Sequence, residues 1–406
     1  MAKQRNLPLF ILMMNMFIAF IGVGLIIPVL PKFILEFGAS GKDLGYLVAA
    51  MGLTQFLFSP LGGKYADQYG RKRMNIIGLA ILALSQFIFS FGQELWMLYF
   101  SRLIGGVGLA FLIPANLAYV ADATTEEGRS KGMGLLGAAM SLGFVISPGI
   151  GGLLAEFGLR VPFYVSTVIA FIATILSLLF LPETLTKEKM KEARMAGKKK
   201  EGILKPFSRS LRVPYFWLLL LILTLTFGLA AFQTTLGLYV DNKHGYSPKD
   251  IAILLTVGAL VGVIVQAMIF DKMVRSLGET RMMKICFPLS ALFIVLMLFS
   301  GDFIYLLFMI ILFSISTSLL RPGLNTLLSK KAGDEQGYVA GMNNSYGSIG
   351  NIIGPALAGM LFDIQINLPF FLIGIILLGS LFVTMIGANK EMAHFEAKKV
   401  KQNKPL

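Results

Sequence analysis

The chain has 406 residues, of which 56% are apolar and only 14% are charged, and its mean hydropathy is +0.74. A soluble protein of this length needs a charged exterior, so the composition excludes one and indicates that lipid covers most of the surface. The formal net charge of +14 would suggest nucleic-acid binding in a soluble protein. Here the basic residues collect in a few loops, and we expect no nucleic acid as a partner.

Twelve apolar stretches with few or no charges follow one another along the chain. About 20 helical residues cross the hydrocarbon of a bilayer, and these runs lack the alternation of barrel strands, so each predicts a membrane-spanning helix. The first run is too long for the core of a signal peptide and lacks a cleavage pattern, so we expect it to be retained. In chain order the predicted spans are 7–31, 44–63, 74–93, 95–121, 132–155, 161–182, 213–240, 251–270, 285–301, 303–329, 336–362 and 364–389.

The predicted fold class is therefore an all-α integral membrane protein with twelve transmembrane helices in two six-helix bundles. The longest connection between spans is basic and separates six spans from six, and its first part, from Glu183 to Ala196, is expected to form a short surface helix. The predicted domains are an N-terminal bundle (1–182), a basic linker (183–212), a C-terminal bundle (213–389) and a basic tail (390–406).

The basic residues predict the orientation, because Lys and Arg concentrate in cytoplasmic loops. With the N-terminus taken as cytoplasmic, the segments on that side hold 29 of the 36 basic residues and the opposite loops hold five. Both termini, the linker and the tail are therefore predicted to be cytoplasmic. The remaining two, Arg102 and Arg321, lie inside spans.

The two halves of the chain repeat each other. Gly and Ser let membrane helices approach closely, and Pro removes one backbone hydrogen bond, so a Gly-Pro pattern predicts a conformational role. Parallel halves of six spans place a pathway between them, which rocking of the halves opens to alternate sides. The pattern comprises Gly143, Ser147, Pro148, Gly151 and Gly152 in the fifth span and, 207 residues later, Gly350, Gly354, Pro355, Ala358 and Gly359 in the eleventh.

The loop after the second span combines a carboxylate with glycines and a basic cluster. It contains Gly63, Asp67, Gly70 and Arg71, followed by two further basic residues. A carboxylate at a helix end beside a cationic cluster can form a charge relay that holds one conformation through bonds to neighbouring helix ends. The equivalent loop of the second half, 271–278, is more degenerate.

These motifs resemble those of the major facilitator superfamily. The 63–73 loop is similar to its signature, Arg102-x2-Gly105-Gly106-x-Gly108 resembles its fourth-span motif, and the Gly-Pro element of the fifth span resembles the antiporter motif of its exporters. The first span, with Gly22-x-Gly24-x3-Pro28-x2-Pro31, resembles that of twelve-helix drug/proton antiporters, and stretches such as 44–50 and 227–232 are similar to Gram-positive multidrug exporters. The resemblance implies two pseudo-symmetric six-helix bundles and a secondary exporter.

Charged residues at bilayer depth are costly and are candidates for function. Arg102 in the fourth span and Arg321 in the tenth are such residues, with either substrate or proton handling or a structural hydrogen-bond hub as their role. All 22 acidic residues fall in loops or at span ends. The membrane core therefore holds arginines and no carboxylate.

This absence departs from the family pattern. The related exporters carry acidic residues at two positions where this chain has Gln233 and Ser318, which cannot ionise. Such a cavity should disfavour lipophilic cations and accept neutral, zwitterionic or anionic compounds. Proton coupling would then use a peripheral carboxylate such as Asp67, Asp122 or Asp241, of which we favour Asp122, or a proton carried by the substrate.

The substrate cavity can be outlined from the resemblance. Aromatic faces with a few amides suit varied amphipathic ligands, because no single geometry is demanded. Packing or lipid-facing roles are the alternative for each aromatic residue. The matching positions are Phe20, Ile27, Gln55, Asn116, Phe144, Gln233, Gln266, Ser318 and Asn351.

No pattern for catalysis accompanies these features. The sequence has no phosphate-binding Gly-x4-Gly-Lys-Ser/Thr loop, no metal-ligand constellation and no nucleophile with a base. We expect no enzyme activity, no catalytic residue, no cofactor and no metal, and an ion gradient as the source of energy.

The sequence thus predicts an exporter of small amphipathic compounds, a multidrug antiporter driven by protons. A dedicated exporter or flippase for an endogenous anionic or amphiphilic metabolite, such as a siderophore or lipid, is the first alternative. A membrane receptor without transport is the second. The expected partners are amphipathic substrates, protons and membrane lipid. We expect a functional monomer in the cytoplasmic membrane of a Gram-positive bacterium.

Overall fold

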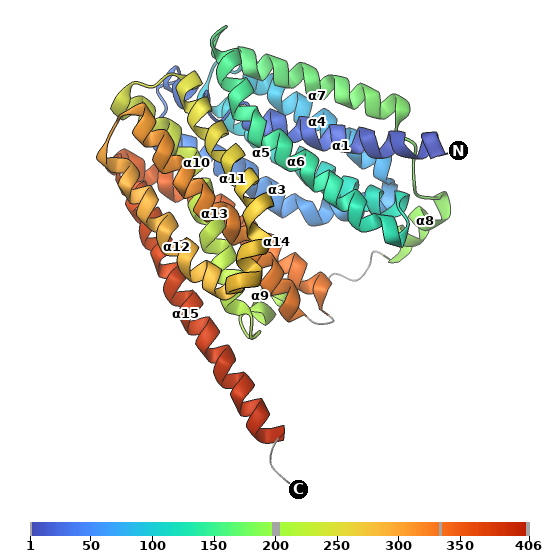
Figure 1. Cartoon of the computed structure of the whole chain (residues 1–406). Helices are drawn as coiled ribbons and strands as arrows, with labels where there is room; N and C mark the ends of the chain where they lie inside the picture. The colour runs from blue at the N-terminus through green and yellow to red at the C-terminus, as the bar shows by residue number, and fades with distance from the viewer. Residues whose placement is uncertain (1, 197–203, 333–334, 403–406) are drawn as a thin grey trace. The chain divides into compact units, whose positions relative to one another are not determined.

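The computed structural model describes residues 2–196, 204–332 and 335–402, and within these ranges it is helical without strands (Figure 1). Most of the helices are long enough to cross a bilayer, and the short ones lie in the connections. In chain order they are α1 (Ala2–Gly24), α2 (Leu30–Leu35), α3 (Gly41–Tyr69), α4 (Arg71–Phe91), α5 (Leu95–Ala123), α6 (Glu126–Ala155), α7 (Val161–Phe180), α8 (Lys187–Ala196), α9 (Leu204–Ser210), α10 (Phe216–His244), α11 (Pro248–Leu277), α12 (Glu279–Leu296), the 3-10 turn η1 (Met297–Phe299), α13 (Phe303–Ala332), α14 (Gln336–Ile364) and α15 (Leu368–Gln402).

The prediction of twelve spans is confirmed. Among the described residues, twelve helical segments are long and apolar enough to cross a membrane. Several helices continue beyond the uncharged runs, as α3 does by passing Asp67 and ending at Tyr69. Charged side chains at a helix end can reach water while the backbone stays helical, so a charge limits the hydrocarbon span but not the helix. The short surface helix expected in the linker is also confirmed, as α8.

The first predicted span, 7–31, is wrong as a single helix. The structure ends α1 at Gly24, passes through hydrogen-bonded turns at 25–29, and starts the short helix α2 at Leu30. Pro28 has no N–H to continue the α1 ladder, and proline disfavours helical backbone at the residue before it. Hydropathy could not reveal this break, because the turn residues are as apolar as the helix.

The last helix is longer than its predicted span. α15 continues past residue 389 to Gln402, so the predicted basic tail begins as helix. This stretch is rich in Lys, Glu and Ala, which favour helix, and contains neither Gly nor Pro after residue 387 until Pro405.

The chain forms two compact units, which are described separately. Unit 1 comprises 1–201 together with 233–256 and 355–363, and unit 2 comprises 202–232, 257–354 and 364–406. The boundaries cut through α10, α11 and α14, so unit 1 contains one end of each of these helices. The predicted bundles 1–182 and 213–389 remain a prediction.

Glycines bring the backbones of unit 1 into direct contact. A Cβ at Gly78 in α4 would lie 2.8 Å from the carbonyl oxygen of Gly108, and a Cβ at Gly108 in α5 would lie 2.9 Å from that of Gly78. On the other face of α5, a Cβ at Gly106 would collide with the backbone of Met51 in α3. Real Cβ atoms do not approach carbonyl oxygens this closely, so α3, α4 and α5 can pack this tightly only with glycine at these positions.

The Gly-Pro pattern of the fifth span forms the contact between α6 and α1. A Cβ at Gly143 would lie 2.6 Å from the carbonyl oxygen of Phe17, and one at Gly151 would collide with the backbone of Leu25. α6 continues as helix through Pro148. In this way the pattern fixes α6 against α1 and against the turn that follows it.

The repeated pattern does the same in unit 2. Cβ atoms at Gly350 and Gly354 of α14 would each lie 2.6 Å from a carbonyl oxygen of α10, those of Leu223 and Phe227 respectively. The sequence repeat therefore corresponds to a repeated helix pair, α1 with α6 and α10 with α14.

We predict that Gly151→Ala lowers the thermal stability of the purified protein in detergent. The added Cβ has no room against Leu25, and overpacking of this kind costs about 1–3 kcal/mol. Gly134→Ala is the matched control on the same helix, because a Cβ there meets nothing within 4 Å. Equal melting temperatures for the two variants, measured by fluorescence-detected size-exclusion after heating, would contradict the packing argument.

Candidate functional site

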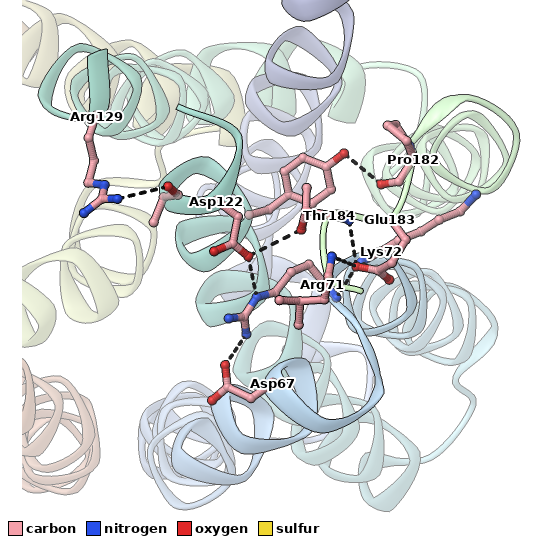
Figure 2. A network of polar contacts seen from close by, with 11 residues as sticks. Asp67, Arg71, Lys72, Asp122, Arg129, Pro182, Glu183 and Thr184 are labelled. Atoms are coloured by element: carbon pink, nitrogen blue, oxygen red, sulfur yellow. Dashed lines mark hydrogen bonds and ion pairs between the residues drawn. The ribbon is translucent and has the colours of Figure 1, made fainter. Parts of the chain in front are cut away.

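A charged network joins three helices of unit 1 at one end, which we call the basic end because it carries the 63–73 and 122–131 loops (Figure 2). Arg71, the first residue of α4, places Nη1 2.5 Å from Oδ1 of Asp67 near the end of α3. Its Nε donates to Oδ2 of Asp122 near the end of α5, at 3.1 Å. The planar guanidinium thus binds two carboxylates from two helices at once. The loop motif with Asp67 and Arg71 and the separately predicted Asp122 meet here.

The contribution of each pair depends on its exposure. The side chain of Arg71 is 10% exposed, that of Asp122 31% and that of Asp67 54%. Exposed ion pairs contribute little to stability, whereas partly buried ones are screened less. The pair with Asp122 is therefore the less screened of the two, although the contact with Asp67 is the shorter one.

Gly70 makes the sharp turn that brings Arg71 to this position. Its backbone has φ +106° and ψ 147°, a conformation that residues with a Cβ rarely adopt. A Cβ there would also collide with the carboxylate of Glu183. Glycine is therefore required twice, for the turn and for the space beside it.

Glu183, the first residue after the predicted sixth span, caps α4. Its Oε1 accepts a hydrogen bond from the backbone N–H of Arg71 at 2.9 Å, and its Oε2 accepts one from that of Lys72 at 3.2 Å. A carboxylate in this position satisfies free N–H groups of the helix and interacts favourably with the helix dipole. The sequence predicted only a charged linker here, because nothing local indicates which helix an acid 112 residues away will cap.

The linker helix α8 docks on the end of α3. Nε of Arg194 donates to the carbonyl oxygen of Gln68 at 2.8 Å, and the guanidinium carbon lies 4.7 Å from the centre of the Tyr69 ring. Gln68 donates in return to the carbonyl oxygen of Ala193 at 3.4 Å. The linker is therefore attached to the same network as Arg71.

Arg102 lies in a different environment, inside unit 1. The residue is 5% exposed, its Nη1 lies 3.9 Å from Sδ of Met51, and its guanidinium carbon lies 4.3 Å from the centre of the Phe89 ring. Its Nε has no hydrogen-bond partner among the described residues. The alternative of a hydrogen-bond hub is therefore not what the structure shows: the guanidinium is held by an aromatic ring and a sulfur atom.

Arg321 of unit 2 is exposed, and its side chain forms no hydrogen bond or ion pair with the residues that the structure describes. Ser318, three residues earlier in α13, donates to the carbonyl oxygen of Ile315 at 3.0 Å within its own helix. Neither residue is part of a polar network within the described part of unit 2.

The predicted cavity residues are divided between the units. In unit 1, Asn116 is buried and donates to the carbonyl oxygen of Leu112 at 3.0 Å, which leaves its Oδ1 without a partner in the described ranges. The remaining members of unit 1 are half-buried, and those of unit 2 range from half-buried to exposed. They are Phe20, Ile27, Gln55, Phe144 and Gln233 in unit 1 and Gln266, Ser318 and Asn351 in unit 2. A shared cavity remains a prediction.

The residues of the conformational motif contact their neighbours unequally. A Cβ at Gly63 in α3 would make only an ordinary van der Waals contact with Pro114, at 3.9 Å, whereas one at Gly152 of α6 would collide with Ala252 of α11. The carbonyl of Pro355 in α14 packs on Gly45 of α3. No group of three or more His, Cys, Asp or Glu side chains among the described residues could hold a metal ion.

The Major Facilitator Superfamily model matches residues 12–355 and 267–406. The chain belongs to this superfamily. It is 42% identical to multidrug resistance protein 2 of Bacillus subtilis over 94% of this chain and 95% of that protein. It is 35% identical to the quinolone resistance protein NorA of Staphylococcus aureus over 93% and 96%. It superposes with a TM-score of 0.79, at 13% identity, on a bacterial homologue of the lysosomal transporter Spinster, covering 95% of this chain and 97% of that one.

The second half of this superfamily member carries a reduced version of the Arg71 network. Gly278, 208 residues after Gly70, again has a positive φ of +75° and lies between two helices. The ion pair beside it joins Glu279 of α12 to Nζ of Lys330 in α13, at 2.5 Å. The second half thus has the same glycine turn. Beside it, a single ion pair between a lysine and a glutamate replaces the arginine that two aspartates share in the first half.

We predict a coupling energy of about 0.5–3 kcal/mol between Arg71 and Asp122, the range for residues of one ion-pair network. It would be measured as a double-mutant cycle in thermal or denaturant unfolding with Arg71→Ala, Asp122→Ala and the double variant. Lys72→Ala is the control, since this neighbouring cation uses only its backbone N–H in the network. If a cycle with Lys72 gives the same coupling energy to Asp122, the coupling comes from the general positive charge of the loop and not from the contact of Arg71 with Asp122.

Proposed function

We propose that this protein is a secondary exporter of amphipathic compounds, a multidrug efflux antiporter driven by the proton gradient. The observation that carries the proposal is similarity over more than 90% of both chains to proteins named for multidrug resistance and quinolone resistance. Proton coupling is typical of the superfamily and supplies the energy that the sequence leaves to an ion gradient.

The charge asymmetry supports an orientation with both termini in the cytoplasm, and the relatives from Bacillus and Staphylococcus support a Gram-positive cell. The basic end of unit 1, with Asp67, Arg71 and Asp122, then faces the cytoplasm. We propose that this network acts as a charge relay that stabilises one conformation of the transport cycle. A complete pathway in one chain is consistent with a functional monomer in the cell membrane, in contact with membrane lipid.

The polar groups of the spans suggest which compounds are carried. Gln233 and Ser318 offer hydrogen bonds without charge, and the buried guanidinium of Arg102 has no carboxylate among its described contacts. We propose that Arg102 and Arg321 handle substrate or protons and that the cavity residues bind neutral, zwitterionic or anionic compounds better than cations. Quinolones carry a carboxylate, and NorA is named for resistance to them.

A second function keeps the fold and changes the cargo. The unpartnered Nε of Arg102 in the described structure and the absence of membrane carboxylates also suit a dedicated exporter or flippase of an endogenous anionic or amphiphilic metabolite. It would differ from the first proposal in transporting one class of compound and no drugs.

The proton antiport is tested with purified protein in liposomes. We expect an imposed pH gradient to drive accumulation of a fluoroquinolone inside liposomes that contain the protein in inside-out orientation. The accumulation should be stronger than that of the cationic dye ethidium. Protein-free liposomes control for passive partition of the fluoroquinolone, which can cross a bilayer in its uncharged form. Uptake that is the same with and without the gradient would contradict proton antiport, and transport of neither probe would favour the dedicated exporter.

We predict that Gln233→Glu combined with Ser318→Asp improves export of lipophilic cations. Each change adds a carboxylate where the related exporters carry one, and an opposite charge in the cavity favours a cationic ligand. Resistance to ethidium of an efflux-deficient host that expresses the variant is the measurement, with Thr317→Asp, the buried neighbour of Ser318, as a control for added charge elsewhere on α13. Unchanged resistance at equal expression would count against the cavity argument.

A further inference from the structure

The membrane core lacks carboxylates, so a carboxylate that binds the transported proton lies at a helix end or in a loop. Among the acids that form ion pairs in the described structure, two have side chains only 11% exposed, Asp241 in α10 and Glu279 in α12. The partner of Glu279 lies at 2.5 Å, whereas the partner of Asp241, Nζ of Lys32, lies at 3.5 Å. Asp241 is therefore both shielded and weakly bound.

Asp241 lies where α2 contacts α10 within unit 1. One turn before it, a Cβ at Gly237 would lie 2.8 Å from Cγ of Pro31, the residue next to Lys32. The two residues of the pair are 209 positions apart and come from opposite halves of the sequence. Any movement of α10 relative to α2 would therefore change the distance between the carboxylate and the ammonium.

Two further acids fix the same end of unit 1, which we call the clasp end. Asp363 at the end of α14 accepts hydrogen bonds from the backbone N–H groups of Gly41 at 2.7 Å and Lys42 at 3.1 Å, at the start of α3. Glu156 after α6 accepts one from Nζ of Lys249 at the start of α11, at 2.8 Å. Glu156 and Asp363 are 207 residues apart, the offset of the internal repeat.

These two clasps differ from Asp241 in their surroundings. The side chain of Glu156 is 49% exposed and Asp363 is exposed, so water stabilises both as carboxylates whatever the partner does. Asp241 is shielded from water and has one long ion pair. Loss of that pair would leave a shielded charge, and shielding disfavours the charged form of a carboxylate.

The acids of the basic end are poorer candidates. Asp67 and Asp122 share Arg71, and a guanidinium stays protonated at any physiological pH. Protonation of either acid would therefore leave a half-paired, largely buried cation. Lys32 is 33% exposed, so its ammonium can return to water when Asp241 is protonated.

We propose that Asp241 is the residue that binds the transported proton. Its carboxylate would alternate between the ion pair with Lys32 and the protonated form, and this alternation would couple the pH gradient to opening of the clasp end. The inference rests on the proposed export function. In the step, water at the outer face transfers a proton to a carboxylate oxygen of Asp241, and no covalent bond between heavy atoms changes. Lys32 keeps its charge and exchanges the ion pair for water, so α2 and α10 are free to separate.

The lysines and the acid around this site already have partners, whereas Nε2 of His244 is buried without a hydrogen-bond partner among the described residues. On α10 itself, Nζ of Lys243 donates to the hydroxyl of Tyr239 at 3.0 Å, and the His244 ring packs edge-on against the Tyr239 ring. On α11, Asp250 accepts the hydrogen bonds of Ser247, and Lys249 is bound to Glu156. Lys32 of α2 is the only cation whose ion pair with Asp241 the described structure contains.

The test is Asp241→Asn in liposomes, with a fluoroquinolone as the probe. Asparagine resembles the protonated acid, so we expect uptake driven by the pH gradient to fall at least tenfold, while exchange of labelled for unlabelled probe without a gradient stays within about twofold and loses its pH dependence. Glu156→Gln and Asp363→Asn are the matched controls, and both should keep gradient-driven uptake. Normal gradient-driven uptake by Asp241→Asn would overturn the proposal.

A second measurement separates coupling from folding. Addition of the probe to purified wild-type protein in weak buffer should release protons, detected with a pH indicator dye, and Asp241→Asn should release none. Lys32→Gln should move the pH of half-maximal release upward by about one unit, because loss of the cation makes the carboxylate easier to protonate. An unmoved midpoint, or full release by Asp241→Asn, would overturn the inference. Wild-type protein that transports the probe without regard to the gradient would overturn the proton antiport itself.

Discussion

Hydrocarbon offers no hydrogen bonds, and this constraint decides where each polar group of the chain lies. Backbone groups are bonded within helices, and the carboxylates lie at helix ends, where they bind cations or cap helices, as Asp122 and Glu183 do. Arg102 departs from this pattern, with an aromatic ring and a sulfur atom around a 5% exposed residue. A cation in this position is costly, so its retention indicates a use beyond packing.

Much of the fold follows from the sequence because span length is a direct physical quantity. Twelve apolar runs correspond to twelve helices, and the repeated Gly-Pro pattern corresponds to two helix pairs with the same backbone contacts. The break between α1 and α2 could not be predicted from hydropathy, since the residues of the turn are apolar. The capping role of Glu183 and the docking of Arg194 depend on which distant helix ends meet, which a single sequence does not encode locally. The Arg71 network lies between these extremes: its motif predicted a charge relay with Asp67, but not that Asp122 of α5 shares the same arginine.

The two kinds of contact in unit 1 have different mechanical properties. At Gly78 and Gly108 backbone touches backbone, and such contacts cannot adapt by changing rotamers. α4 and α5 should therefore move as one body. Ion pairs and caps at the helix ends, such as Lys32 with Asp241, can be exchanged for water or a proton at modest cost. A packed body with exchangeable contacts at its ends is suited to two-state motion.

The two clasps at the ends of α14 and α6 occupy equivalent positions of the repeat but use different donors. Asp363 binds backbone N–H groups, whereas Pro248 stands in α11 where α3 has Gly41 and offers no N–H, so Glu156 binds the Lys249 side chain. The halves therefore differ in their tolerance to mutation. A single codon change at Lys249 can delete one clasp, whereas the N–H of residue 42 is present in every amino acid except proline. Loss of Asp363 or of Glu156 would delete the respective clasp, so the two clasps differ in this tolerance on the donor side alone.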